Sequence, residues 1–139
     1  MWIDPDNGPD VVIDLLRKTL EVNLIGTIDF TQKILSLVED QGHIVNISSR
    51  QGSLGYASNT SDPSYRISKA ALNMFTRILA IHLQDKITVS SVHPGWVKTD
   101  MGGQNADMEP QEAAKYIYDL AVSRPETGQF WFKGEKFPW

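Results

Sequence analysis

Tyr65 and Lys69 are the pair of residues in this sequence best suited to move a proton. Their four-residue spacing places both side chains on one face of a helix, where they can touch. An ammonium about 4 Å from a phenolate stabilises it by about 4 kcal/mol at an effective dielectric constant of about 20. Lys69 would therefore lower the pKa of the Tyr65 phenol toward the neutral range. By spacing alone, an ordinary surface pair on a helix is the commoner interpretation.

Two polar segments follow the strand-like runs of the sequence. Ser49 ends one run, and the segment 93–100, which begins His93-Pro94-Gly95, leaves the next. In an open parallel sheet, ligands bind beyond the carboxyl ends of the strands. Both segments are thus predicted to lie where a substrate would bind, although an ordinary strand-end serine and a plain turn would look the same.

The elements that position these residues alternate between helix and strand. Apolar residues at three- and four-residue spacing predict helices over 11–39, 62–83 and 110–122. Runs rich in β-branched or aromatic residues predict strands over 43–49, 87–93 and 129–132. Such alternation implies right-handed crossovers and a parallel sheet covered on both faces. The predicted fold is therefore α/β, one domain over residues 1–139, with about three strands and three main helices.

Local signals refine three of these elements. Ser61-Asp62-Pro63 supplies a capping side chain and a first-turn proline for the second helix, and Gly26 is expected to bend the first helix or to permit close packing. The strand over 43–49 would normally have a further neighbour. We expect its open edge to be covered by the amino-terminal segment, by a second copy of the chain or by a fragment outside this sequence.

Composition excludes several functions. The net charge is -4, and no cluster of Lys and Arg indicates nucleic acid or an anionic membrane as a partner. The sequence has no cysteine for a disulfide or a thiolate zinc site, and His43, His82 and His93 lack ligand-like spacing, so no metal site is predicted. We find no signal peptide or membrane span, which makes the cytoplasm the expected location.

Four motifs in a fixed order carry a family resemblance. The motifs are Asn23 within 21–27, the strand end 46–49, the helix segment 65–71 and the turn 94–99. Together they resemble the short-chain dehydrogenase/reductase family. The ending over 127–132, with Gly134 and the final Pro138-Trp139, resembles the carbonyl-reductase branch that includes sniffer and C-factor proteins. The resemblance extends from about Asp10 to the end. It implies the catalytic, carboxy-terminal half of a Rossmann-like, doubly wound fold.

The resemblance implies a catalytic role for each of four residues. Tyr65 would be the general acid that protonates a carbonyl oxygen, or the base in the oxidative direction. Lys69 would lower the pKa of Tyr65 and bind the nicotinamide ribose. Ser49 would hold and polarise the substrate oxygen, and Asn23 would anchor a water in the proton relay.

The turn after the second strand would carry the remaining contacts implied by the resemblance. Pro94, Gly95 and Val97 would line the nicotinamide of NADP or NAD, with Thr99 near the phosphates. The substrate side would be shaped by Trp96, Met101 and Gly102.

The sequence departs from the family pattern in two places. Ser49 and Tyr65 are sixteen positions apart, a few more than usual, and the extra length in loop 52–60 is expected to reshape the substrate pocket. More seriously, none of the ten glycines forms the glycine-rich turn that holds the pyrophosphate. The amino-terminal nucleotide-binding half is therefore missing from the pattern, and we expect most of the cofactor affinity to be lost.

Three functions remain open at this point. The preferred one is a carbonyl-reductase fragment that transfers hydride from NADPH to a ketone or aldehyde when the missing half is supplied. A nucleotide-independent ester hydrolase would use Ser49, Tyr65 and Lys69 as nucleophile and activating groups. A non-catalytic module would self-associate as a dimer or tetramer through the helices over 11–39 and 62–83.

Overall fold

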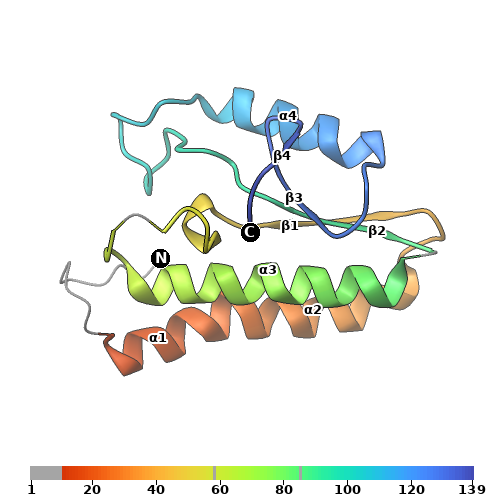
Figure 1. Ribbon diagram of the computed structural model, residues 1–139, viewed down its shortest axis with the longest axis horizontal. Coiled ribbons are helices and arrows are strands. Elements are labelled where there is room, and N and C mark those ends of the chain that lie inside the picture. Colours follow the sequence, from red (N-terminus) through yellow and green to blue (C-terminus); the bar gives the residue numbers. More distant parts are fainter. Residues whose placement is uncertain (1–10, 58, 85) are drawn as a thin grey trace.

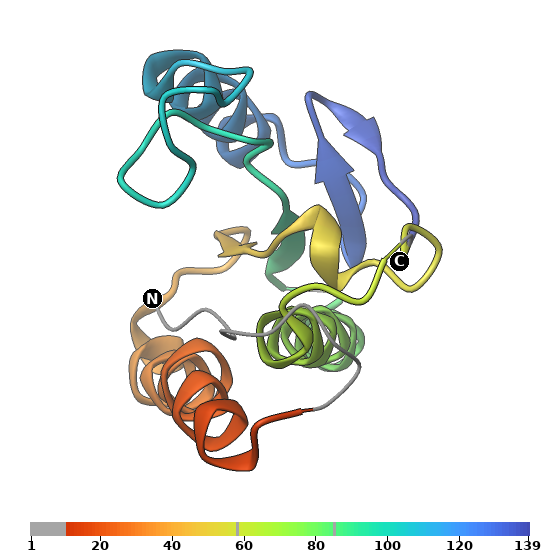
Figure 2. The same cartoon turned by 90° about the vertical axis from the view of Figure 1, so that its left-hand side faces the viewer.

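The protein has three layers, with a sheet between helices on both faces (Figure 1). A computed structural model describes residues 11–57, 59–84 and 86–139. Helix α4 (Pro110–Ser123) covers one face of the sheet, and the view turned by 90° shows α1 and α3 side by side on the other (Figure 2). This second helical layer comprises α1 (Ile13–Leu20), the π-helical turn η1 (Glu21–Ile25), α2 (Gly26–Ile34), the 3-10 turn η2 (Leu35–Leu37) and α3 (Pro63–Leu83).

The sheet has the order β1-β2-β3-β4. Strands β1 (His43–Ile47), β2 (Thr88–Val92) and β3 (Gln129–Phe132) are parallel, which confirms the predicted α/β class. The fourth strand, β4 (Glu135–Lys136), pairs antiparallel with β3 and was not predicted. Lys133 and Gly134 turn the chain between them with φ values of 48° and 82°, as a two-residue hairpin requires. The sheet is therefore small and mixed.

The first predicted helix contains an irregular turn in its middle. The chain stays helical from α1 through η1 into α2, but η1 has the wider π-helical hydrogen bonding and contains Asn23. Gly26 begins α2, and a Cβ there would lie 3.3 Å from the carbonyl oxygen of Glu21. Glycine at this position thus permits the close approach of the turn before it. Single π turns of this kind are frequent at functional sites.

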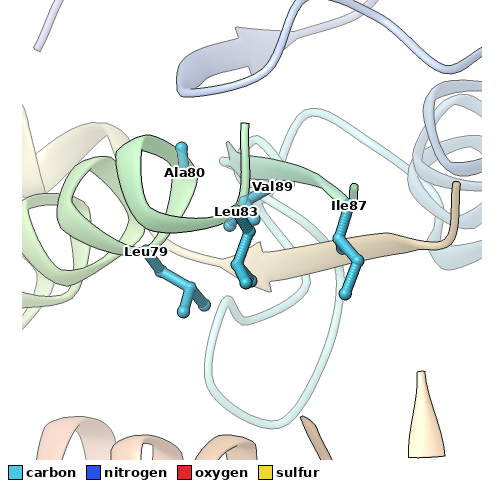
Figure 3. Close-up of a cluster of buried hydrophobic side chains, with 5 residues drawn as sticks. All are labelled: Leu79, Ala80, Leu83, Ile87 and Val89. Carbon is cyan, nitrogen blue, oxygen red and sulfur yellow. The ribbon is translucent and has the colours of Figure 1, made fainter. Parts of the chain in front are cut away.

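Helix α3 begins with Pro63 in its first turn, as predicted, but the expected cap differs. Asp62 precedes it with φ at 50° and makes no side-chain capping hydrogen bond. The left-handed backbone at Asp62 takes the place of an extended capping residue. At the other end of α3, Leu79, Ala80 and Leu83 pack with Ile87 and Val89 in a buried cluster (Figure 3).

Strand β1 pairs with β2 on one edge, and no other described strand pairs with its second edge. Beside that edge lies a groove of about 490 Å³, which we call the edge groove. It is lined by η1 and α2 on one side and by β1 on the other, with Lys69 and Leu72 of α3 completing it. An amino-terminal cover for this edge was one of the predictions, and residues 1–10 lie outside the described part. No helix in the described ranges is long and apolar enough to cross a membrane.

Candidate active site

Tyr65 and Lys69 lie in the first two turns of α3, beside the carboxyl end of β1. The Lys69 Nζ lies 5.7 Å from the centroid of the Tyr65 ring and donates a hydrogen bond to the carbonyl oxygen of Ile47 at 2.9 Å. Ile47 is the last residue of β1, so this bond joins the helix to the end of the strand. The spacing-based prediction that the two side chains share one face is confirmed.

Ser49 is hydrogen-bonded to Tyr65 through their side chains. The serine precedes the 3-10 turn η3 (Arg50–Gly52), and its Oγ accepts a hydrogen bond from the Gln51 N–H at 3.2 Å. This contact orients the hydroxyl toward the turn that follows the strand. The Ser49 and Tyr65 hydroxyl groups therefore lie close together just beyond the carboxyl end of β1.

The pKa of Tyr65 shifts in the direction opposite to the one its spacing suggested. Burial raises the pKa of the phenol; the Ser49 hydrogen bond lowers it by less, and the Asp62 carboxylate raises it further. Burial also lowers the pKa of Lys69. Tyr65 is consequently a protonated phenol at neutral pH in this chain, which suits a proton donor.

Asn23 reaches the same region from the π-helical turn. Its Nδ2 donates to the Ser68 Oγ at 3.0 Å, and Ser68 donates to the carbonyl oxygen of Tyr65 at 2.7 Å. Ser68 has no exposed surface, so this chain of bonds is an internal tie between η1 and the first turns of α3. Asn23 and Lys69 both line the edge groove. The structure therefore brings Asn23, Ser49, Tyr65 and Lys69 to one end of the sheet.

The turn after β2 is held by a bridge between Val97 and Met108. The Met108 N–H donates to the Trp96 carbonyl at 3.1 Å, and the Lys98 N–H donates to the Met108 carbonyl at 2.9 Å. In this pattern the N–H of Val97 itself points away from Met108. The Val97 N–H therefore takes no part in the hydrogen bonds that form this bridge.

Trp96 and Gly102 are joined across the next turn. The indole Nε1 of Trp96 donates to the Gly102 carbonyl at 2.8 Å, and a Cβ on Gly102 would lie 1.9 Å from the Val97 carbonyl oxygen. Gly102 is thus required by the close backbone approach, whatever its relation to a substrate. Met101 is 59% exposed, and Thr99 bonds within the turn through its Oγ1.

A second hollow, of about 210 Å³, lies between this turn and the residues that follow Ser49. We call it the aromatic pocket. It contains two of the predicted residues, Gly95 and Trp96. His93 and Tyr56 also line it, and they belong to the segments 93–100 and 52–60 that were predicted to lie near the substrate. The lining residues that sequence reasoning missed are Arg50, Asp107, Met108, Phe132, Lys133 and Phe137.

Sequence reasoning also missed the residues through which η3 packs and hydrogen-bonds against α3. A Cβ on Gly52 would lie 2.7 Å from the carbonyl carbon of Lys69, so only glycine allows the turn to sit on the helix there. Asn73 donates to the Gly52 carbonyl at 3.2 Å and accepts from Ser91 at 2.7 Å. The available signal was a glycine three residues after Ser49. These contacts place Ser49 relative to Lys69 without touching a substrate.

Two of the three histidines have structural contacts. His43 hydrogen-bonds through its ring nitrogens to the Ala121 carbonyl at 3.0 Å and to the Ser90 hydroxyl at 2.9 Å. His93 accepts the Gly95 N–H on Nδ1 at 3.1 Å and stacks on Phe132 with ring centroids 4.0 Å apart. Within the described ranges, no group of three or more His, Asp or Glu side chains is placed to hold a metal ion.

This arrangement of a serine, a tyrosine and a lysine at the carboxyl ends of parallel strands defines a class of protein. The family model described as short chain dehydrogenase matches residues 9–110, and the chain belongs to that family of oxidoreductases. The predicted family membership is confirmed.

Individual relatives agree with this assignment. The chain is 29% identical over 130 residues to the C-signal protein of Myxococcus xanthus, covering 89% of this chain and 78% of the relative. Carbonyl reductase Sniffer of D. melanogaster superimposes with a TM-score of 0.86 at 29% identity, over 100% of this chain and 64% of that one. The likeness to carbonyl reductases is thereby confirmed.

A third comparison concerns the cofactor. The NADPH-bound carbonyl reductase from chicken fatty liver matches with a TM-score of 0.85 at 27% identity, over 99% of this chain and 62% of that one. The chain therefore spans less than two thirds of the length of both solved structures. NADP is a cofactor of this family.

The resemblance assigns Lys69 and Val97 to the nicotinamide end of such a cofactor, where the Lys69 Nζ and the Val97 N–H would be the donors. The sequence contains no glycine-rich turn for the diphosphate.

Proposed function

We propose that this chain is the proton-donating half of a carbonyl reductase, competent when a nucleotide-binding half is present. The hydrogen-bonded Ser49 and Tyr65 side chains, with Lys69 one turn along α3, are the observation that carries this proposal. Lys69 and Val97 would hold the nicotinamide end of NADPH, which supplies a hydride when bound. The substrate would be a ketone or an aldehyde.

In this reaction, Ser49 and Tyr65 would both donate hydrogen bonds to the substrate oxygen. The Tyr65 phenol would then transfer its proton to that oxygen as the carbonyl carbon is reduced. Because burial raises the pKa of Tyr65, the phenol stays protonated at neutral pH and is ready to act as the acid. Asn23, tied to Ser68, would hold a water on the path that returns a proton to Tyr65.

The test joins the amino-terminal portion of the D. melanogaster reductase, for which this chain has no counterpart, to the present chain. NADPH oxidation is followed with an aromatic aldehyde. We expect turnover that falls at least about 100-fold in Tyr65→Phe, in line with the usual contribution of a general acid. Tyr118→Phe, at a 67% exposed tyrosine on α4, is the matched control and should retain full activity. Equal turnover by both variants in a fusion that binds NADPH would refute the proposal.

Ester hydrolysis is less well supported by these contacts. A serine nucleophile needs a base to take its proton. The described partners of the Ser49 hydroxyl are the Gln51 N–H, which is a donor, and Tyr65, whose raised pKa makes it a weak base.

A homodimer through the long helices is also part of the proposal. Four large apolar residues with more than 40% exposure follow one side of α3, and they are Ile67, Met74, Ile78 and Ile81. A second copy would bury this stripe. Ile78→Glu should convert a dimer to a monomer in light scattering, whereas Lys115→Glu on α4 should not. A wild-type chain that is monomeric at all concentrations would refute it.

A further inference from the structure

The aromatic pocket begins next to Ser49, because Arg50, the following residue in the chain, is one of its lining residues. Arg50 and Tyr56 come from η3 and the loop after it, Trp96 from the turn after β2, and Phe132 and Phe137 from the end of the chain. If Ser49 and Tyr65 hold a carbonyl oxygen, as in the proposed function, this pocket is the neighbouring space for the rest of the substrate. The inference below rests on that function for the orientation of the ligand only.

The walls of the pocket suit a flat aromatic ring. Tyr56 and Trp96 are 47% and 43% exposed and so present free ring surface. At the floor, His93 is buried between Phe132, on which it stacks, and Phe137, which meets it edge-on at 4.6 Å. An apolar cavity of about 150 Å³ accommodates benzene. A pocket of about 210 Å³ therefore has room for one ring and a small substituent.

Arg50 supplies an unused positive charge at this site. Its guanidinium lies 5.8 Å from the centre of the Tyr56 ring, and among the residues described no carboxylate pairs with it. The other cation, Lys133, is paired with Glu112 at 3.0 Å. Arginine on an aromatic face keeps its in-plane N–H groups free for a carboxylate.

One carboxylate, Asp107, also lines the pocket, and it is exposed. Burial first, and the Arg50 charge second, lower the pKa of His93 to about 4, which indicates that the Arg50 guanidinium lies near the His93 ring in this pocket.

The end of the chain holds the loop that bears Tyr56. The Gly55 N–H donates to the Trp139 carbonyl oxygen at 2.9 Å, and the Phe137 N–H donates to the Phe130 carbonyl at 2.7 Å. Trp139 also stacks on Phe130 at 5.4 Å. Gly55, the residue before Tyr56, is thereby linked through the end of the chain to β3.

We propose that the aromatic pocket binds the aromatic ring of a carbonyl compound that carries a carboxylate, with the ring beside Tyr56 and Trp96 and the carboxylate on Arg50.

The test measures binding to the chain without nucleotide, so it is independent of turnover. The probes are 4-acetylbenzoate and its neutral analogue acetophenone, titrated with detection by ligand NMR. We expect 4-acetylbenzoate to bind about tenfold more tightly, the effect of one charge-assisted contact. Arg50→Gln should abolish this preference while leaving acetophenone unchanged. Arg17→Gln, at an exposed arginine on α1, is the matched control and should bind like the wild type.

Tyr56→Ala should weaken both probes, because the ring wall is common to them. Equal affinities for the two probes in the wild type, no saturable binding of either, or an Arg50→Gln variant that matches Arg17→Gln would each overturn the proposal. Loss of turnover in the fusion enzyme with intact probe binding would instead count against the proposed function alone.

Discussion

Strand β1 divides the molecule into a packed region and an open one. Beyond one edge of β1, α3 and α4 cover the sheet. Four residues of β2 have no exposed surface there, and they are Val89, Ser90, Ser91 and Val92. Beyond the other edge, the helical stretch from α1 to α2 has only two buried residues among those described, Thr19 and Thr31, and the edge groove separates it from β1. Ser49 and Tyr65 are positioned by the packed region. The contacts that position Tyr65, the proposed acid, therefore all come from the described residues on the packed side of β1.

In the packed region, the 3-10 turn η3 lies directly against the backbone of α3 at Gly52. Gly52→Ala forces a methyl group to within 3 Å of the Lys69 backbone, and we expect it to lower the free energy of unfolding by about 3 kcal/mol. Denaturant unfolding of the purified chain measures this. Gly55→Ala, whose Cβ would find its nearest neighbour at 3.5 Å, should change it by less than about 0.5 kcal/mol. Similar losses in both variants would show that η3 is not packed on the helix as described.

Two valines on adjacent strands allow the stability of the packed and the open region to be compared by mutation. Val89 of β2 is fully buried, whereas Val45 of β1 is partly exposed and lines the edge groove. Val89→Ala should cost about 2 kcal/mol and Val45→Ala about 1 kcal/mol or less, because less contact is lost at the groove. Unfolding curves for the two variants give the difference. Equal costs would mean that β1 is as well covered as β2.

Through His93, the free energy of unfolding is expected to depend on pH. Its pKa is lowered to about 4 by burial first and by Arg50 second, against about 6.5 in an unfolded chain. Between these values the unfolded state binds more protons, so the stability present above pH 6.5 is lost as the pH falls toward 4. We expect a loss of about 1–2 kcal/mol between pH 7 and pH 5.

The measurement is the free energy of unfolding at both pH values. His93→Gln should remove most of this loss, while His82→Gln, at an exposed histidine, should retain it. An unchanged loss in His93→Gln would assign the pH dependence to other groups.

Elements with a clear period were predictable from the sequence, and irregular ones were not. The bounds of β3 agree with the prediction, and α3 differs by one residue at its start, because β-branched or aromatic runs and apolar stripes are local signals. Strand β4 has two residues and no period, and it depends on positive φ at Lys133 and Gly134. The π-helical turn at Asn23 has no sequence pattern that distinguishes it from an α-helix.

The sequence motifs were sufficient to predict which residues form the candidate site, but not how buried these residues are. The order of Asn23, Ser49, Tyr65 and Lys69 identified the family, but spacing contains no information on burial. The pKa of Tyr65 was therefore expected to fall, whereas desolvation raises it. The contacts of Gly52 with Lys69 and of Asn73 with Ser91 join residues about 20 positions apart, and only the folded chain brings them together.

NADPH binding to the purified chain alone tests the central claim most directly. Cofactor fluorescence is titrated at several protein concentrations, with the D. melanogaster fusion as the positive control. We predict no saturable binding by the 139-residue chain at micromolar levels and clear binding by the fusion, because the sequence of the chain itself contains no glycine-rich turn for the diphosphate. Saturable micromolar binding by the chain itself, lost in Lys69→Ala, would contradict the claim that the chain needs a nucleotide-binding half to hold NADPH.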